Sequence, residues 1–234
     1  ILSIRESVVS FSMLPLPLFI LMGTVMFHSG IAPAVIDALD KWLGRLPGRL
    51  GLLAVVAGTV LSTLTGASMA SVAILGSSLV PEMEKRGYQK PMTLGPILGS
   101  GGLAIMIPPS GLAVFLGAIG EISIGKILLA IIIPGLVMAA LYALYISLRC
   151  FLQPHLAPAY EFEAVPIMEK IIPTVRYVLP LGLIIFLVVG LIFLGVATPT
   201  EAAATGALGT FALVFLYGKL NWEVVRKAVA EGVW

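Results

Sequence analysis

The stretches Ser62-Thr-Leu-Thr-Gly-Ala-Ser-Met-Ala-Ser71 and Ser100-Gly-Gly-Leu-Ala-Ile-Met-Ile-Pro-Pro-Ser110 decide the fold, because each places polar or helix-breaking residues inside an otherwise apolar segment. Glycines and a Pro-Pro pair favour interruptions of a helix. Within a bilayer, non-helical backbone is tolerated only where it is buried in protein or lines a cavity. The two stretches therefore predict a protected cavity at membrane depth, and we expect the function there.

The composition places the chain in a membrane. Hydrophobic residues make up 59% of the 234 residues, charged residues make up 11%, and the mean hydropathy is +1.08, far above that of an average soluble domain. A formal net charge of +2 gives no reason to expect a nucleic-acid partner. The single cysteine, Cys150, excludes an internal disulfide and offers no metal-binding pattern. The sequence predicts an all-α integral membrane protein.

Residues 50–80 are predicted to form a re-entrant helical hairpin with its tip near residues 65–68. These 31 residues carry no charge, and they are too few for two full spans, which would need roughly 40 residues. A hairpin returns to the side it entered from, so its flanks should share one charge character. Each flank has three basic residues: Lys41, Arg45 and Arg49 before it, and Lys85, Arg86 and Lys90 after it.

Residues 92–120 are predicted to form a broken helix. One break is expected at Gly99–Gly102 and a second at Pro108–Ser110, with the helix resuming at Gly111. Glycine allows the backbone angles that a break requires, and proline removes a backbone donor.

The remaining elements follow from hydropathy and periodicity. They are a span at 14–36, a polar loop at 37–49, a span at 127–148 kinked at Pro134–Gly135, an amphipathic arm within 149–177, spans at 178–196 and 202–218 with Thr200 as N-cap of the second, and an amphipathic helix at 222–233. The predicted divisions are 1–36, the first spanning helix; 37–126, a transport-type module; 127–177, a spanning helix and arm; and 178–234, two spanning helices and the start of a second arm.

The basic residues predict the orientation of the chain. Threading these elements through a membrane places twelve of the fourteen Lys and Arg residues on one face, which the positive-inside rule assigns to the cytoplasm. Arg5, Lys126 and the turn at Thr198 lie on the other face.

The two interrupted stretches offer ligands for ions. Hydroxyls and freed carbonyls suit cations such as Na⁺, and exposed amides at a restarted helix suit a carboxylate. Thr65, Ser68 and Ser71 supply hydroxyls, Gly66 allows close backbone approach, and Ser100–Gly102 are expected to expose a second length of backbone.

Three other interpretations stay open at this point. The small residues Gly58, Ser62, Gly66 and Ala70 can simply pack helix against helix. An intramembrane hydrolase would use a serine with a histidine base, and Ser68 with His28 is the pair available. A passive channel would conduct without coupling to a gradient.

The chain resembles the large membrane subunit of the TRAP (tripartite ATP-independent periplasmic) transporters of bacteria and archaea. Five motifs carry the resemblance in the family's order: Leu14-Pro-Leu-Pro-Leu-Phe-Ile-Leu-Met-Gly23, Thr65-Gly-Ala-Ser-Met-Ala-Ser71, Pro81-Glu-Met-x-x-x-Gly-Tyr88, Ile107-Pro-Pro-Ser110 and Thr198-Pro-Thr-Glu-Ala-Ala-Ala204.

The resemblance implies a multi-pass inner-membrane protein, not an enzyme, that imports organic acids such as dicarboxylates, sialic acid or oxo acids, with Na⁺ as coupling ion and no other cofactor. It implies a periplasmic binding protein and a small membrane subunit as partners, and one half of an inverted-repeat elevator fold. The residues that map to the cation-binding hairpin are Thr65, Gly66, Ser68 and Ser71; those that map to the broken helix are Ser100, Gly101, Gly102, Pro108, Pro109 and Ser110; and sodium is expected on Thr65, Gly66, Ser68 and Gly102.

The chain departs from the family pattern in two ways. Ala67 stands where a serine is frequent, and Ala104 stands where a glycine is usual. One hairpin motif and one Pro-Pro-Ser break are present, so we expect the second repeat in sequence beyond this piece or on another chain. A sodium/dicarboxylate symporter of related fold is the alternative class.

Overall fold

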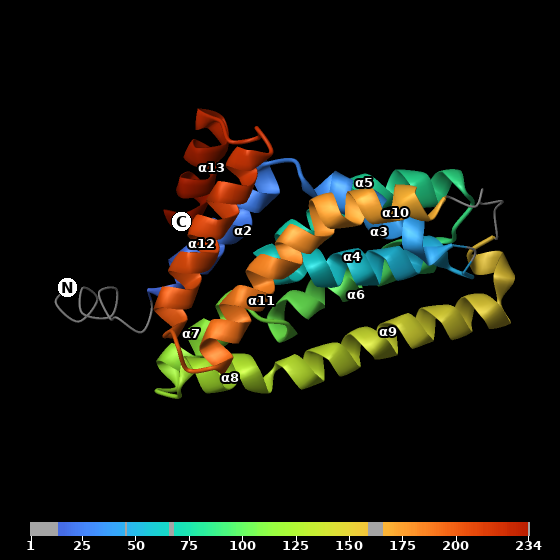
Figure 1. Ribbon diagram of the computed structural model, residues 1–234. Helices are drawn as coiled ribbons and strands as arrows, with labels where there is room; N and C mark the ends of the chain where they lie inside the picture. Colours follow the sequence, from blue (N-terminus) through green and yellow to red (C-terminus); the bar gives the residue numbers. More distant parts are fainter. Residues whose placement is uncertain (1–13, 45, 66–67, 159–165, 234) are drawn as a thin grey trace.

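The computed structural model describes residues 14–44, 46–65, 68–158 and 166–233, and these ranges are helical apart from short connections (Figure 1). The elements in chain order are α2 (Pro15–His28), α3 (Ala32–Leu43), α4 (Arg49–Thr65), α5 (Ser68–Lys85), α6 (Lys90–Met106), α7 (Gly111–Ile119), α8 (Ile124–Ala130), α9 (Ile132–Leu152), the single turn η2 (Pro154–Leu156), α10 (Ile167–Pro173), the π-turn η3 (Thr174–Val178), α11 (Leu179–Phe193), α12 (Pro199–Leu216) and α13 (Trp222–Val233). In this part of the chain, three helices are long and apolar enough to cross a membrane, or up to five if each of two bent pairs is one span.

The first predicted span, 14–36, is wrong as a single helix. α2 ends at His28, and α3 begins at Ala32 at an angle of 78° to it. Gly30 makes this corner possible, because its φ of +67° lies in the left-handed region that glycine tolerates. Most of the predicted polar loop at 37–49 therefore belongs to α3, an amphipathic helix with Val35, Ile36 and Ala38 on its buried side.

The predicted hairpin is present as α4 and α5. Its two ends meet, since the backbone N–H of Leu50 donates a hydrogen bond to the hydroxyl oxygen of Tyr88 at 3.4 Å. α5 continues through Pro81 to Lys85, five residues beyond the predicted end at Val80. Arms of 17 and 18 residues are about 26 Å long at 1.5 Å per residue, which is shorter than the roughly 30 Å hydrocarbon core of a bilayer.

The broken helix has one break rather than two. α6 is continuous through the predicted break at Gly99–Gly102, and the helix is interrupted only at 107–110, where α7 bends away by 42°. Prolines at positions 108 and 109 cannot donate the hydrogen bonds that would continue α6. Val72 of α5 packs tightly against Gly101, whereas a Cβ on Gly102 would meet nothing within 4 Å.

The remaining helices lie close to the positions predicted from the sequence. α8 and α9 form one candidate span of 29 residues, interrupted at Ile131, close to the predicted kink at Pro134–Gly135. α11 and α12 occupy the predicted spans at 178–196 and 202–218, and α13 occupies the predicted amphipathic helix.

The predicted amphipathic arm is only partly testable, because residues 159–165 lie outside the described ranges. Its later part, α10 and η3, continues without a break into α11, giving one apolar helix from Ile167 to Phe193. α10 has no buried residue and contacts α3, where the Nε1 of Trp42 donates to the hydroxyl of Thr174 at 2.8 Å.

The hairpin and α6 form the central packing unit. α4, α5 and α6 contact one another pairwise, and in Figure 1 all three lie above α9. A cluster of buried apolar residues joins all three helices to α9, including Leu53, Leu75, Leu103 and Ile146. A second cluster joins α2, α7, α8, α11 and α12.

Candidate functional site

The tip of the hairpin and the break after α6 lie at the same end of the packing unit. α4 and α6 start side by side at the hydrogen bond between Leu50 and Tyr88, run in the same direction, and are both 17 residues long. Their last residues, Thr65 and Met106, are therefore at about the same depth, and α5 starts from that level. Gly66, Ala67 and the side chain of Thr65 lie outside the description, so those candidate ligands stay predictions.

Ser100 and Gly101 pack helices together and do not expose backbone. A Cβ on Gly58 of α4 would clash with the Cβ of Ser100, and a Cβ on Gly101 would clash with the Cγ2 of Val72 in α5. Ser100 is completely buried. The expected exposed backbone is therefore wrong at Ser100 and Gly101, where the packing interpretation of the small residues is correct, whereas Gly102 is half-buried and a Cβ there would meet nothing within 4 Å.

Hydroxyl groups nevertheless line the contact between the hairpin and α6. Ser62 donates a hydrogen bond to the carbonyl oxygen of Ser100 at 3.4 Å, and the Ser100 hydroxyl donates to the carbonyl oxygen of Ile97 at 2.8 Å. The position of a Cβ on Gly101 would lie 3.4 Å from the carbonyl oxygen of Ser68. Ser71 is buried one turn further along α5. The structure thus brings both predicted polar stretches together at Ser62, Ser68 and Ser100–Gly101.

The free carbonyl groups at the end of α6 lie later in the sequence than predicted. Because proline has no N–H, Pro108 and Pro109 deprive the carbonyls of Ala104 and Ile105 of their helical partners four residues on. The carbonyl oxygen of Met106 faces Gly135 of α9, where a Cβ would clash with it. The sequence contained this signal, since each proline frees the carbonyl four residues before it.

Pro108, Pro109 and Ser110 shape the break more than they line a polar surface. The two prolines lie in an apolar pocket against Leu128 of α8 and Val188 of α11. Ser110 is fully buried, and its hydroxyl oxygen accepts a hydrogen bond from the N–H of Ala113, which caps α7.

Helix ends supply the electrostatics of this region. The carboxyl ends of α4 and α6 carry partial negative charge and favour a cation, whereas the amino end of α5 carries partial positive charge and favours an anion. Within the described ranges, no group of three His, Cys, Asp or Glu residues could hold a metal ion. Hydroxyl and carbonyl oxygens are the cation ligands that this part of the chain offers.

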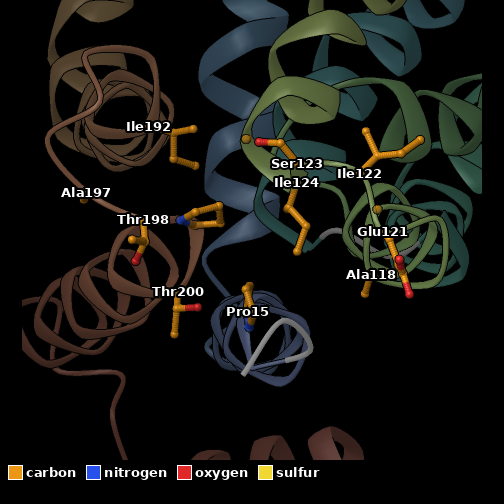
Figure 2. Close-up of a pocket in the computed structure, with 13 residues that line it drawn as sticks. Pro15, Ala118, Glu121, Ile122, Ser123, Ile124, Ile192, Ala197, Thr198 and Thr200 are labelled. Carbon is orange, nitrogen blue, oxygen red and sulfur yellow. The ribbon is translucent and has the colours of Figure 1, made fainter. Parts of the chain in front are cut away.

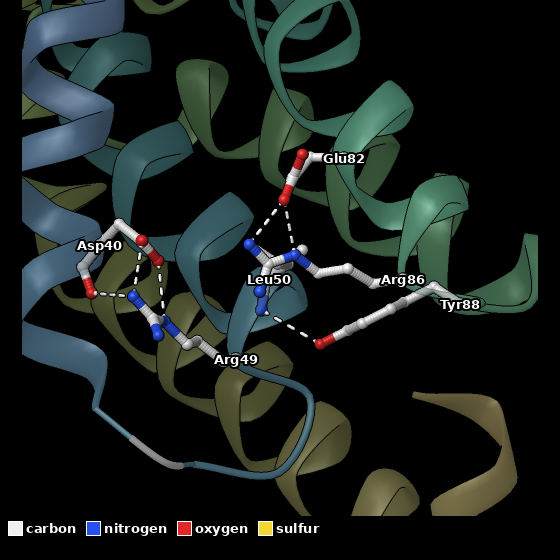
Figure 3. Close-up of polar contacts among 6 residues, drawn as sticks. All are labelled: Asp40, Arg49, Leu50, Glu82, Arg86 and Tyr88. Carbon is white, nitrogen blue, oxygen red and sulfur yellow. Dashed lines mark hydrogen bonds and ion pairs between the residues drawn. The ribbon is translucent and has the colours of Figure 1, made fainter. Parts of the chain in front are cut away.

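Charged side chains gather at the opposite end of the hairpin, its mouth (Figure 3). Arg49 donates to both carboxylate oxygens of Asp40, at 2.9 and 2.6 Å, and to the Asp40 carbonyl oxygen at 3.0 Å. Arg86 donates through Nε to Glu82 at 2.6 Å. The mouth therefore coincides with basic residues that the charge pattern assigns to the cytoplasm.

A pocket of about 570 Å³ lies where three other segments meet (Figure 2). It is lined by Pro15 at the start of α2, by the α7–α8 turn with Glu121 and Ser123, and by the α11–α12 turn with Thr198. The structure thus joins the turn preceding Lys126 to the turn at Thr198, which the charge pattern places on one face. Thr198, and not the predicted Thr200, is the N-cap of α12, in a capping box with Glu201.

The hydrolase alternative gains no geometric support. His28 ends α2, which packs against α13, and its ring contacts that of Phe27 edge-on at a centroid distance of 4.9 Å. Ser68 starts α5 beside Gly101 of α6. His28 and Ser68 thus pack against different helices.

Residues 2–233 match the family described as "Tripartite ATP-independent periplasmic transporter, DctM component". The chain belongs to the DctM family of TRAP transporters. The relatives of this DctM-family chain include an uncharacterized protein, YgiK, of Salmonella typhimurium, 32% identical over 224 residues that cover 95% of this chain and 50% of the relative. They also include the C4-dicarboxylate TRAP transporter large permease protein DctM of Pseudomonas aeruginosa, 30% identical over 94% of this chain and 51% of the relative.

A third relative is the ectoine TRAP transporter large permease protein TeaC of Halomonas elongata, 30% identical over 88% of this chain and 47% of the relative. The chain spans about half the length of the curated relatives it matches. Those with a stated role are named as transporter permeases rather than as enzymes. The family predicted from the five sequence motifs is confirmed.

Proposed function

We propose that the chain is part of the large membrane subunit of a sodium-driven TRAP transporter in a bacterial or archaeal inner membrane. The observation that carries the proposal is the shared depth of the hairpin tip and the α6 break, which follows from the common start and equal length of α4 and α6. Discontinuous helices that meet at the membrane midplane are how secondary transporters bind substrates and coupling ions.

Sodium is proposed to bind at the hairpin tip, on the predicted ligands Thr65, Gly66 and Ser68. The carboxyl ends of α4 and α6 favour a cation there, and the carbonyl groups of Ala104 and Ile105, freed by the two prolines, are closer to the end of α6 than the predicted ligand Gly102. The sodium ligands from α6 are therefore proposed to be the carbonyl oxygens of residues 104–105 in place of Gly102.

The transported compound is proposed to be an organic acid that binds beside the sodium site, where the amino end of α5 favours a carboxylate. The relatives named for C4-dicarboxylate and ectoine support a small polar organic solute. Ser71 lies one turn after the start of α5, and Pro108–Ser110 follow directly after the end of α6. These residues stay candidates for contact with the substrate or for shaping its site.

Movement is proposed to follow the elevator mechanism, with the hairpin and α6 moving as one body. Their shared buried cluster and the clash of a Cβ at Gly58 with Ser100 support a rigid unit. The two amphipathic arms, α10 with η3 and α13, would belong to the stationary frame. An inverted second repeat would complete the site.

A periplasmic binding protein and a small membrane subunit are the proposed partners. The pocket between the α7–α8 turn and the α11–α12 turn lies at the face assigned to the periplasm, opposite the basic hairpin mouth. A related sodium/dicarboxylate symporter would share the hairpin but would not need a binding protein, so dependence of uptake on that protein separates the two. A channel would show flux without sodium coupling.

The test is uptake of radiolabelled C4-dicarboxylate by cells that express the complete transporter containing this chain. Ser68→Ala is expected to abolish sodium-dependent uptake while the amount of protein in the membrane stays unchanged. Ser77→Ala is the matched control, because Ser77 is on the same helix and its hydroxyl donates to the carbonyl oxygen of Ile74 in that helix. Uptake at the wild-type rate by Ser68→Ala would refute the sodium site.

A further inference from the structure

A narrow groove lies between the first half of α6 and the second half of α9, away from the hairpin tip. It encloses about 230 Å³ and is lined by Gly95 and Gly99 on α6 and by Tyr142, Tyr145 and Arg149 on α9, among others. The transport proposal uses none of these side chains.

Two glycines create the groove. Gly95 and Gly99 are one helical turn apart, so they leave the same stripe of α6 without side chains. A Cβ on Gly95 would meet nothing within 4 Å, and a Cβ on Gly99 would lie 3.6 Å from the ring of Tyr142. The space beside Gly95 is therefore open, and the ring of Tyr142 closes it at Gly99.

One end of the groove is positively charged. Arg149 is in the last turn of α9 and lines the groove, and Lys90 is the first residue of α6, next to the lining residue Pro91. Both side chains are exposed, and the ion pairs of the described residues involve other arginines and lysines. The charged end therefore lies where both helices leave the apolar region.

The other walls continue into apolar surface. Leu94 and Leu98 on α6 and Leu144 and Leu148 on α9 are 45%, 61%, 54% and 51% exposed. Of the 18 most apolar consecutive residues in the α8–α9 span, only 11% are buried inside the molecule. An apolar surface of this kind is suited to contact with lipid, so the groove suits an acyl chain and its charged end suits a headgroup.

We propose that this groove binds an anionic phospholipid, with an acyl chain along Gly95 and Gly99 and the phosphate at Arg149. Tyrosine and arginine side chains are suited to the headgroup level, where the apolar stem lies in the membrane and the polar end in water. The volume of the groove is below the roughly 300 Å³ of the smallest typical ligand pockets, which suits a single acyl chain. Anionic headgroups are also attracted to basic residues at the cytoplasmic surface.

Other occupants match the groove less well. A helix of a partner protein could pack on the glycine stripe, but such packing has no need of the positive charge at Arg149. A soluble anion would use Arg149 and leave the apolar part without a function. A lipid satisfies both ends.

The experiment is native mass spectrometry of the complete transporter containing this chain, purified in detergent and titrated with phosphatidylglycerol, with phosphatidylcholine of the same acyl chains, or with inorganic phosphate. The wild type is expected to bind phosphatidylglycerol about fivefold more tightly than phosphatidylcholine, the effect expected of one basic residue at an anionic surface. Gly95→Leu fills the open space and is expected to reduce binding of both lipids. Arg149→Gln keeps the groove and is expected to remove the preference for phosphatidylglycerol.

Two control variants make the same changes elsewhere. Gly76→Leu adds the same side chain to α5 at a helical glycine that also has nothing within 4 Å, and Lys126→Gln removes one positive charge at the opposite end of the α8–α9 span. Both should bind lipid as the wild type does. Equal lipid binding by Gly95→Leu and Gly76→Leu, equal affinity of the wild type for both lipids, or displacement of phosphatidylglycerol by inorganic phosphate would each overturn the proposal. If Gly95→Leu lowers stability, Arg149→Gln still tests the headgroup position.

Discussion

The guanidinium of Arg49, at the start of α4, donates hydrogen bonds to both carboxylate oxygens and to the backbone carbonyl oxygen of Asp40 in α3. The arginine side chain is only 5% exposed. This contact ties the mouth of the hairpin to the helix that precedes it. A guanidinium buried to this extent depends on its partner, because an unpaired charge loses hydration without compensation.

The first prediction concerns this ion pair. Asp40→Asn is expected to lower the free energy of unfolding by about 2 kcal/mol, less than the 3–5 kcal/mol for a fully buried pair because the Asp40 side chain is 31% exposed. Asp37→Asn on the same helix is the control and should have little effect. Unfolding in detergent, followed by circular dichroism, measures both, and equal stability of the two variants would contradict the prediction.

The second prediction tests the close packing of α4 on α6. Gly58→Ala is expected to cost about 1–3 kcal/mol, the usual cost of overpacking, because its Cβ would clash with the Cβ of Ser100, which cannot rotate away. Gly76→Ala is the matched control in the other arm, where a Cβ meets nothing within 4 Å. It should be neutral or stabilising by up to about 1 kcal/mol, the helix-propensity difference between glycine and alanine. Unfolding midpoints in the same detergent decide between them.

The hairpin could be predicted from the sequence because its evidence is local and has a physical cause. An uncharged segment of 31 residues between two basic flanks fits no simple count of full spans. The break at Pro108–Ser110 could also be predicted, since consecutive prolines must interrupt a helix. The end of α5 could not, because Pro81 is accommodated inside the helix.

Glycine was the ambiguous residue. Gly30 turns the chain between α2 and α3 with φ +67°, whereas Gly101 remains helical and lets Val72 approach closely. The sequence shows the same residue in both places, and only the neighbouring helix determines which role it takes. For this reason the break expected at Gly99–Gly102 was wrong, and the corner at Gly30 was missed.

The third prediction separates the two candidate caps of α12. Thr198→Ala is expected to lower the free energy of unfolding by about 1 kcal/mol, the usual value of an N-cap, because its hydroxyl accepts from the N–H of Glu201 at 3.3 Å and donates to the Glu201 carboxylate at 2.8 Å. Thr200→Ala, at the position expected from the sequence, should have no comparable effect. Greater loss of stability in Thr200→Ala would contradict the observed capping box.

The fourth prediction concerns the carbonyl groups freed at the end of α6. Pro108→Ala restores an N–H four residues after Ala104 and is expected to raise the sodium concentration for half-maximal uptake about tenfold, which corresponds to about 1.4 kcal/mol. Pro96→Ala restores an N–H within the same helix but far from its end, and should leave the sodium dependence unchanged even if it alters stability. An unchanged sodium dependence in Pro108→Ala would argue against a role for residues 104–105 in ion binding.

The fifth prediction concerns the orientation of the two ends of the molecule. Cysteine introduced at Glu121, which lines the pocket between the two turns and is exposed, is expected to react with a membrane-impermeant maleimide in intact spheroplasts. Cysteine at Lys219, in the basic segment after α12, should react only after the membrane is permeabilised. The native Cys150 is 2% exposed and provides the unreactive background. Labelling of Lys219→Cys but not Glu121→Cys in intact spheroplasts would reverse the orientation and place the hairpin mouth on the periplasmic side.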